Sequence, residues 1–238
     1  MTSNKLKIIA CISMVLDHIG YLLFPNIILF RYLGRIALPI FAFFIAEGCL
    51  FTRNKIKYFL QVFALAIICQ TFYIGEALTG GKISSIYLNV LFTFCLSMLC
   101  CCSFIKLTKE IQSGNKKAAA IYGGLFILAI LFSVFCCTMP TKLFGIKITV
   151  DYGIIGVLLP LFAVVFKDKN KRFICFSLGV VVYCIARSFT ELYVWFALLT
   201  LPLMAFYNGE RGSKKLKWAF YLFYPLHFAV IYGISLLK

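Results

Sequence analysis

Long apolar runs are the feature that most constrains this chain. Nine of them follow one another with short polar connections, and each is close to the length of about 20 residues that a helix needs to cross a hydrocarbon core. The chain is 63% hydrophobic and 13% charged, with a mean hydropathy of +0.97, which is far more apolar than a soluble domain. We therefore predict an all-α polytopic membrane protein, a single domain over residues 1–238 that forms one bundle of about nine transmembrane helices, at residues 6–24, 36–52, 58–75, 88–106, 118–137, 150–166, 173–187, 191–207 and 218–237.

The basic residues predict the orientation of this bundle. The net charge is +16, and most of the 24 lysine and arginine residues fall in alternate connections between the apolar runs. Connections rich in lysine and arginine stay on the cytoplasmic side of a membrane, so we expect the N-terminus inside and the C-terminus outside. Because the charges mark topology in this way, they do not indicate nucleic-acid binding. The seventh and eighth runs are separated only by "RSFTEL".

The eleven cysteines all fall inside apolar runs, and none belongs to a C-x-x-C pair accompanied by clustered histidines. A free cysteine in such a place behaves as a small hydrophobic residue. We therefore predict no metal site.

A few ionisable residues lie where topology does not explain them. Asp17, His18 and Glu47 fall within apolar runs, as does the second histidine, His227. Ionisable groups at membrane depth are costly unless they are paired, which makes each a candidate functional residue. We expect the bundle to gather these groups around one polar cavity, because a bundle can bury side chains from several helices together.

Adjacent residues on a helix are about 100° apart, so the side chains of Asp17 and His18 cannot pair with each other as side chains four residues apart do. One is expected to face the cavity and the other a neighbouring helix. Arg31 and Arg35, four residues apart at the outer mouth of the second run, are the natural counter-charges of Asp17. These groups fit three roles: a polar clamp between helices without chemistry, a proton-coupled transporter, or acid–base catalysis, for which histidine is the usual side chain near neutral pH.

The order of several longer motifs resembles the TraX family. They are "LKIIACISMVLDHIG", "RYLGRIALPIFAFFIAEG" followed by "TRNKIKYF", "NVLFTF", "DYGIIGVLLPL", and "FYNGERG" followed by "KWAFYLFYPLHFAVI". The resemblance extends from about Leu6 to Tyr232. The family takes its name from an inner-membrane protein that N-acetylates conjugative pilin, and it is similar to a broader superfamily of membrane acyltransferases.

The resemblance implies a multi-pass enzyme of the inner (plasma) membrane that transfers an acetyl group from cytosolic acetyl-CoA. The acceptor is either a peptide amine, as in a pilin-like membrane peptide, or a hydroxyl of a surface glycan. His18 would act as general base or as a transiently acetylated nucleophile, with Asp17 fixing its tautomer or balancing Arg35. His227 and Tyr224 would orient the acceptor, and Arg31 and Arg35 would shape the cavity or stabilise charge.

The phosphates of acetyl-CoA require cations on the cytoplasmic side. The candidates lie in two basic connections, and the turn at 208–212 adds backbone N–H groups. They are Arg53, Lys55, Asn208, Arg211, Lys214 and Lys215. Glu47 is a second candidate proton relay, and Asn89 and Asp151, which open two of the motifs, are candidate cavity residues.

Overall fold

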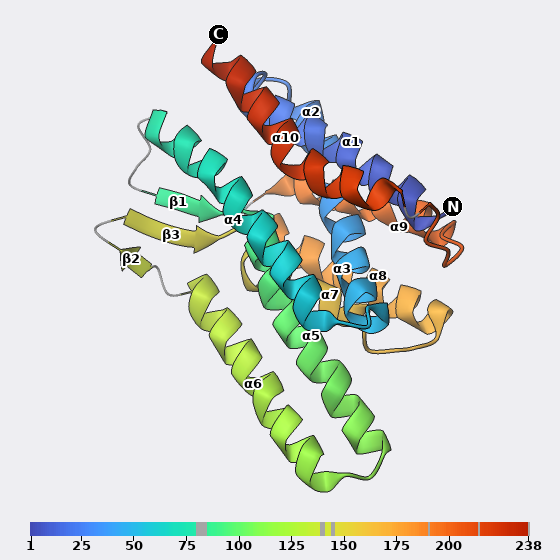
Figure 1. Ribbon diagram of the computed structural model, residues 1–238. Coiled ribbons are helices and arrows are strands. Elements are labelled where there is room, and N and C mark those ends of the chain that lie inside the picture. Colours follow the sequence, from blue (N-terminus) through green and yellow to red (C-terminus); the bar gives the residue numbers. More distant parts are fainter. Residues whose placement is uncertain (80–84, 139–140, 144–145, 190, 214, 238) are drawn as a thin grey trace. The chain divides into compact units, whose positions relative to one another are not determined.

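The computed structural model describes residues 1–79, 85–138, 141–143, 146–189, 191–213 and 215–237, and the chain is predominantly helical (Figure 1). It divides into two compact units, one formed by 1–44 with 169–238 and the other by 45–168. The elements, in chain order, are α1 (Ser3–Leu22), α2 (Ile28–Gly34), α3 (Ala37–Phe51), α4 (Lys55–Thr79), β1 (Ser85–Leu88), α5 (Val90–Gln112), α6 (Lys116–Thr138), β2 (Thr141–Leu143), β3 (Ile146–Val150), α7 (Gly153–Phe162), α8 (Lys169–Ser188), the 3-10 helix η1 (Leu192–Leu199), α9 (Thr200–Ala205) and α10 (Leu216–Leu236).

Five helical segments in the described part of the chain are long and apolar enough to cross a membrane, so the protein is a multi-pass membrane protein. They correspond to five of the nine predicted segments. Their ranges are Ile28–Phe51, Lys55–Thr79, Val90–Gln112, Lys116–Thr138 and Trp218–Leu236.

Of the other four predicted segments, two are also single α-helices and two are not. α1 and α8 are 20 residues long and carry several charges, which lowers their apolar character. The predicted segment 150–166 contains the end of β3 and then the ten-residue helix α7. The segment 191–207 is a 3-10 helix followed by the short α9, not one α-helix. A count of nine membrane-spanning helices and the predicted orientation therefore stay predictions.

In the first unit, α1 packs against α2 and α10 (Figure 1). The start of α1 is held by the loop that precedes α10: the Ser3 N–H donates to the Glu210 carbonyl at 2.8 Å, and the Asn4 amide donates to the Ser213 carbonyl at 2.7 Å. α1 and α10 therefore begin at the same end of the unit and run side by side in the same direction. A cluster of edge-to-face aromatic rings forms part of the core: Phe43, Phe44, Phe176 and Tyr207.

In the second unit, α5 and α6 form an antiparallel hairpin, and a three-stranded sheet in the order β1-β3-β2 lies near the start of α5. β1 is parallel to β3 and β2 is antiparallel to it. This sheet is not evident in the sequence, because its short strands adjoin longer apolar runs.

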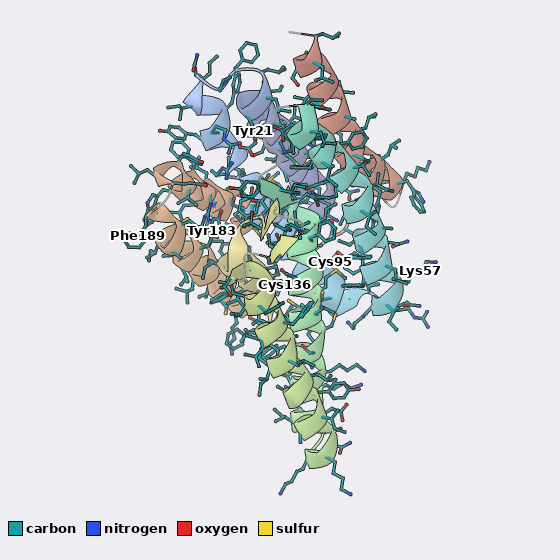
Figure 2. The ribbon with its side chains drawn as sticks, turned by 90° about the vertical axis from the view of Figure 1, so that its left-hand side faces the viewer. Tyr21, Lys57, Cys95, Cys136, Tyr183 and Phe189 are labelled. Atoms are coloured by element: carbon teal, nitrogen blue, oxygen red, sulfur yellow. The ribbon has the colours of Figure 1, made fainter. Side chains whose placement is uncertain are left out.

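Most of the cysteines are buried, as expected for small hydrophobic residues. Seven of the eleven are buried and none of the eleven is disulfide-bonded. Figure 2 labels Cys95 on α5 and Cys136 on α6. Cys100 makes a weak contact with the Ser133 hydroxyl at 3.6 Å.

Asn89 is the N-cap of α5, and its hydrogen bonds are structural. Its side-chain oxygen accepts the Leu91 N–H at 3.1 Å, and its Nδ2 donates to the Ala66 carbonyl and to Gln70 Oε1, both at 2.9 Å. The residue is fully buried. The side chain predicted to line a cavity thus fastens α5 to α4.

Replacing Asn89 with alanine is expected to lower the free energy of unfolding by about 2–3 kcal/mol, because a cap is lost and buried polar partners are left unsatisfied. Asn115 is the matched control: it caps α6 through the Ala118 N–H but is exposed, so Asn115→Ala is expected to cost about 1 kcal/mol. Unfolding of both variants in mixed detergent–SDS micelles, followed by circular dichroism, measures the difference. An Asn89 loss no larger than that of Asn115 would contradict the structural role.

Candidate functional site

The two histidines of the chain meet in the first unit, where α1 lies beside α10. His18 Nδ1 is 2.9 Å from His227 Nε2. The ring centroids are 5.0 Å apart and the planes differ by 28°. The two nitrogens are close together although the ring centroids are far apart, so both nitrogens lie between the centroids. The hydrogen bond therefore lies close to both ring planes. At about 1.5 Å per residue, His18 and His227 lie roughly 22 Å and 17 Å along their helices from the end where both begin.

The hydrogen bonds fix which nitrogens carry protons. His227 Nδ1 is 2.9 Å from the Phe223 carbonyl, and a carbonyl only accepts, so Nδ1 of His227 bears the hydrogen. With both rings neutral, Nε2 of His227 is then the acceptor, and His18 donates to it through Nδ1–H. The second nitrogen of His18, Nε2, is therefore the unprotonated and basic one.

Aromatic rings hold both imidazoles in place. Phe223 stacks on His227 at 5.1 Å with planes 7° apart, and the buried Tyr224 meets His227 edge-on at 5.7 Å. Phe228 meets the His18 ring edge-on at 5.0 Å. Three ring contacts from one helix, α10, thus restrict how the imidazoles turn.

Asp17 points to a different neighbour from His18. Its Oδ1 accepts from Arg35 Nη2 at 2.7 Å and from Arg31 Nη1 at 3.0 Å. The pairing expected from the sequence is present: the carboxylate reaches α2 and the residue after it, while the adjacent imidazole reaches α10. The 100° step between consecutive helix residues explains this division.

Gly34 makes the approach of Asp17 to the arginines possible. A Cβ atom at this position would overlap the Asp17 carboxyl group, so a larger residue would force α1 and α2 apart. The Ser13 hydroxyl donates to the Leu33 carbonyl on the same contact. The glycine of "YLGR" therefore serves the ion pair that the next residue, Arg35, makes.

Three residues of this charged region were not singled out in the sequence. Glu191 Oε2 lies 3.8 Å from Arg35 Nη1, and Glu191 Oε1 accepts from Arg187 Nη2 at 2.8 Å. The Tyr193 ring centroid is 5.1 Å from the Arg35 guanidinium and 5.9 Å from that of Arg31. The sequence does contain a signal for Glu191, because it is one of only eight acids and lies four residues after Arg187. However, the short polar segment "RSFTEL" is typical of a connection between helices.

The loop at 208–212 is built to hold α1. Gly209 and Gly212 have φ of 85° and 77°, which favour glycine, and the Asn208 side chain bonds the Glu210 N–H and carboxylate. The Arg211 carbonyl accepts the Ser3 hydroxyl at 2.7 Å. The side chains of Arg211 and Lys215 are exposed beside this loop, and Lys214 lies outside the described residues.

The remaining candidates belong to the second unit. Arg53 is exposed, the Lys55 ammonium donates to the Cys49 carbonyl, and Glu47 is half-buried on α3. Asp151 Oδ1 accepts the Tyr152 N–H at 2.9 Å and its carbonyl accepts the Thr93 hydroxyl at 2.6 Å. Asp151 therefore bonds the backbone turn that starts α7, just as Asn89 bonds the backbone at the start of α5.

The fold and the site define a multi-pass helical membrane protein with an imidazole pair and an ion-pair cluster in one unit. Residues 2–235 match the family described as TraX protein. The chain belongs to the TraX family.

Two curated proteins illustrate the similarity. The chain is 27% identical over 250 residues to a Dichelobacter nodosus protein described as "Probable fimbrial assembly protein FimC, serogroup H1". The aligned region covers 95% of this chain and 93% of that protein. It is 35% identical over 86 residues to an uncharacterized protein of Rickettsia prowazekii (strain Madrid E), over 36% of this chain and 34% of that protein. No solved structure matches the chain.

Proposed function

We propose that the protein is an acetyltransferase of the inner membrane that moves an acetyl group from acetyl-CoA to an amine or hydroxyl acceptor. The observation that carries the proposal is the directed hydrogen-bond series from His18 to His227 to the Phe223 carbonyl. It leaves His18 Nε2 basic, and a general base for the acceptor is what acyl transfer requires. Membership of a family named for a pilin-acetylating protein supports the same reaction.

In the proposed reaction, His18 Nε2 removes the proton from the acceptor nitrogen or oxygen as that atom attacks the acetyl carbonyl carbon. The carbon–sulfur bond of the thioester then breaks, and the proton passes from His18 to the departing thiolate of CoA. His227 Nε2 continues to accept from His18 Nδ1–H while His18 is cationic, so it stabilises the charge and holds the ring's orientation. Arg31 and Arg35 supply positive charge near the same helix turn.

The acyl donor is a substrate with several phosphates, and the exposed side chains of Arg211 and Lys215 have the charge to bind them. Arg211 lies in the loop that holds the start of α1 and Lys215 follows it, on the side predicted to be cytoplasmic. His18 is roughly 22 Å along α1 from this loop, so the donor has to extend along the helix to reach the base.

For the acceptor, a peptide amine is favoured by the fimbrial name of the Dichelobacter nodosus relative, because fimbriae are assembled from protein subunits. A surface glycan hydroxyl reacts by the same steps.

Release of free thiol from acetyl-CoA by the purified protein, in lipid nanodiscs with membrane peptides or glycan as acceptor, tests the proposal. We expect release that depends on the acceptor, whereas a proton-coupled transporter releases no thiol.

Arg211→Gln with Lys215→Gln is expected to raise KM for acetyl-CoA about tenfold and to leave kcat nearly unchanged, because the pair binds phosphates far from the reacting atoms. The exposed Lys109→Gln with Lys116→Gln is the control for loss of two positive charges. Absence of thiol release with every acceptor would reject the enzyme, and an unchanged KM in the Arg211 and Lys215 variant would reject this placement of the donor.

A further inference from the structure

Five charged side chains of the first unit form a continuous series, here called the arginine cluster. Asp17 Oδ1 bridges Arg31 at 3.0 Å and Arg35 at 2.7 Å. Arg35 forms an ion pair with Glu191 at 3.8 Å, and Glu191 forms a second ion pair with Arg187 at 2.8 Å. Its members come from α1, α2 and the junction of α8 with η1, which are far apart in sequence.

The arginine cluster has more positive than negative charge. Three guanidinium groups face two carboxylates, an excess of one positive charge. The first unit has one other acid, Glu210, and its carbonyl bonds Ser3 at the opposite end of α1 from Asp17. Counted over the side chains of this unit, the arginine cluster therefore keeps one more positive than negative charge.

Burial within the cluster is graded. The side chains of Arg35 and Asp17 are only 5% and 14% exposed, whereas those of Arg31, Glu191 and Arg187 are 25–29% exposed. The buried pair thus holds the cluster together, and the outer guanidinium groups of Arg31 and Arg187 remain partly accessible. An excess charge in such a poorly solvated place attracts an anion more strongly than one on a wet surface.

The chemistry of these groups specifies the anion. A guanidinium presents paired N–H donors whose spacing matches the oxygens of a carboxylate or a phosphate. The Tyr21 and Tyr193 rings lie 5.6 Å and 5.9 Å from the Arg31 guanidinium, which keeps its plane oriented. Asp17 directly precedes His18, so an anion on this cluster lies near the proposed base.

We propose that the arginine cluster binds an anionic group, a carboxylate or a phosphate, carried by the acceptor. The proposal rests on the acetyltransferase function and names the substrate class: an acceptor whose reacting amine or hydroxyl lies close to a negative charge. Arg31 contacts the anion, while Asp17 and Glu191 set the spacing of the arginines and leave the cluster with an excess of one positive charge.

The test measures binding of methyl phosphate to the purified protein in nanodiscs of phosphatidylcholine, by calorimetry, with chloride at matched ionic strength as reference. Arg31→Gln removes the excess charge and is expected to weaken binding about tenfold. Glu191→Gln raises the excess charge to two and is expected to tighten binding several-fold. The exposed Lys5→Gln, a charge change at the other end of α1, is the control and is expected to bind as the wild type does.

Equal affinity in the wild type, Arg31→Gln and Lys5→Gln proteins would overturn the site, as would weaker binding in Glu191→Gln with its unfolding temperature unchanged. Nanodiscs that contain phosphatidylglycerol provide a second arm: if this lipid abolishes methyl phosphate binding, a lipid headgroup occupies the cluster and the assignment to the acceptor is wrong. Binding is measured without acetyl-CoA, so a protein that binds methyl phosphate as predicted but releases no thiol refutes the enzyme and the assignment of the anion to an acceptor, while the anion site itself stands.

Discussion

Replacing His18 with asparagine is expected to lower kcat for acetyl transfer by about 10²–10⁴-fold, the usual contribution of a general base, while the protein stays folded. The asparagine Nδ2–H takes the place of the imidazole Nδ1–H and donates to His227 Nε2, so the contact between α1 and α10 is kept. What the variant lacks is the basic Nε2. Initial rates of thiol release, compared at saturating acetyl-CoA, measure the loss, and the unfolding temperature reports on the fold.

His227 provides the matched comparison. In His227→Gln, the side-chain oxygen lies where Nε2 lay and accepts from His18 Nδ1–H, so a large part of the activity is expected to remain. His227→Leu removes the acceptor, and we expect its kcat to fall well below that of His227→Gln. A His18→Asn protein with wild-type turnover would show that the imidazole pair is only a clamp between helices.

Mass spectrometry of the wild-type protein separates two chemical routes that the kinetics of the variants do not. If His18 is acetylated during the reaction, mass spectrometry of peptides from protein quenched during turnover finds the acetyl group on His18 and finds more of it when the acceptor is omitted. If transfer is direct, the His18 peptide stays unmodified. In both routes His18→Asn has a greatly lowered kcat, so the kinetic result and the mass spectrum answer different questions.

The local part of the site was predictable from the sequence, because it depends on positions within one or two neighbouring helices. Asp17 and His18 stand out as ionisable residues in an apolar run, and the helical step sends them to different neighbours. Arg31 and Arg35 follow closely in the chain, so their pairing with Asp17 requires only that α1 and α2 fold back on each other.

The long-range part was not predictable in the same way. His18 and His227 are 209 positions apart, and hydrophobic periodicity does not specify that α1 packs against α10. Glu191 was missed because it precedes a 3-10 helix where the apolar pattern indicated an ordinary connection and helix. Asn89 and Asp151 were chosen because they open sequence motifs, but their hydrogen bonds show that a motif position can be fixed by a cap or a turn.

Asp17→Asn is expected to lower the free energy of unfolding by about 3 kcal/mol, because it leaves Arg35, only 5% exposed, beside a neutral group. The charge of a buried arginine is retained, so its lost partner is not compensated by water. The control is Glu210→Gln, the same change at an exposed carboxylate, for which a loss of at most about 0.5 kcal/mol is expected. SDS-induced unfolding in mixed micelles measures both.

The double variant Asp17→Asn with Arg35→Gln decides whether the ion pair is the cause. Removing both charges takes away the uncompensated guanidinium, so the double variant is expected to be more stable than Asp17→Asn alone, although Glu191 then retains only Arg187 as its partner. A double variant whose losses simply add would mean that Asp17 and Arg35 stabilise the unit independently. In that case the carboxylate would be held by its fit against Gly34 rather than by its charge, and an excess of positive charge would not be the property that the arginine cluster preserves.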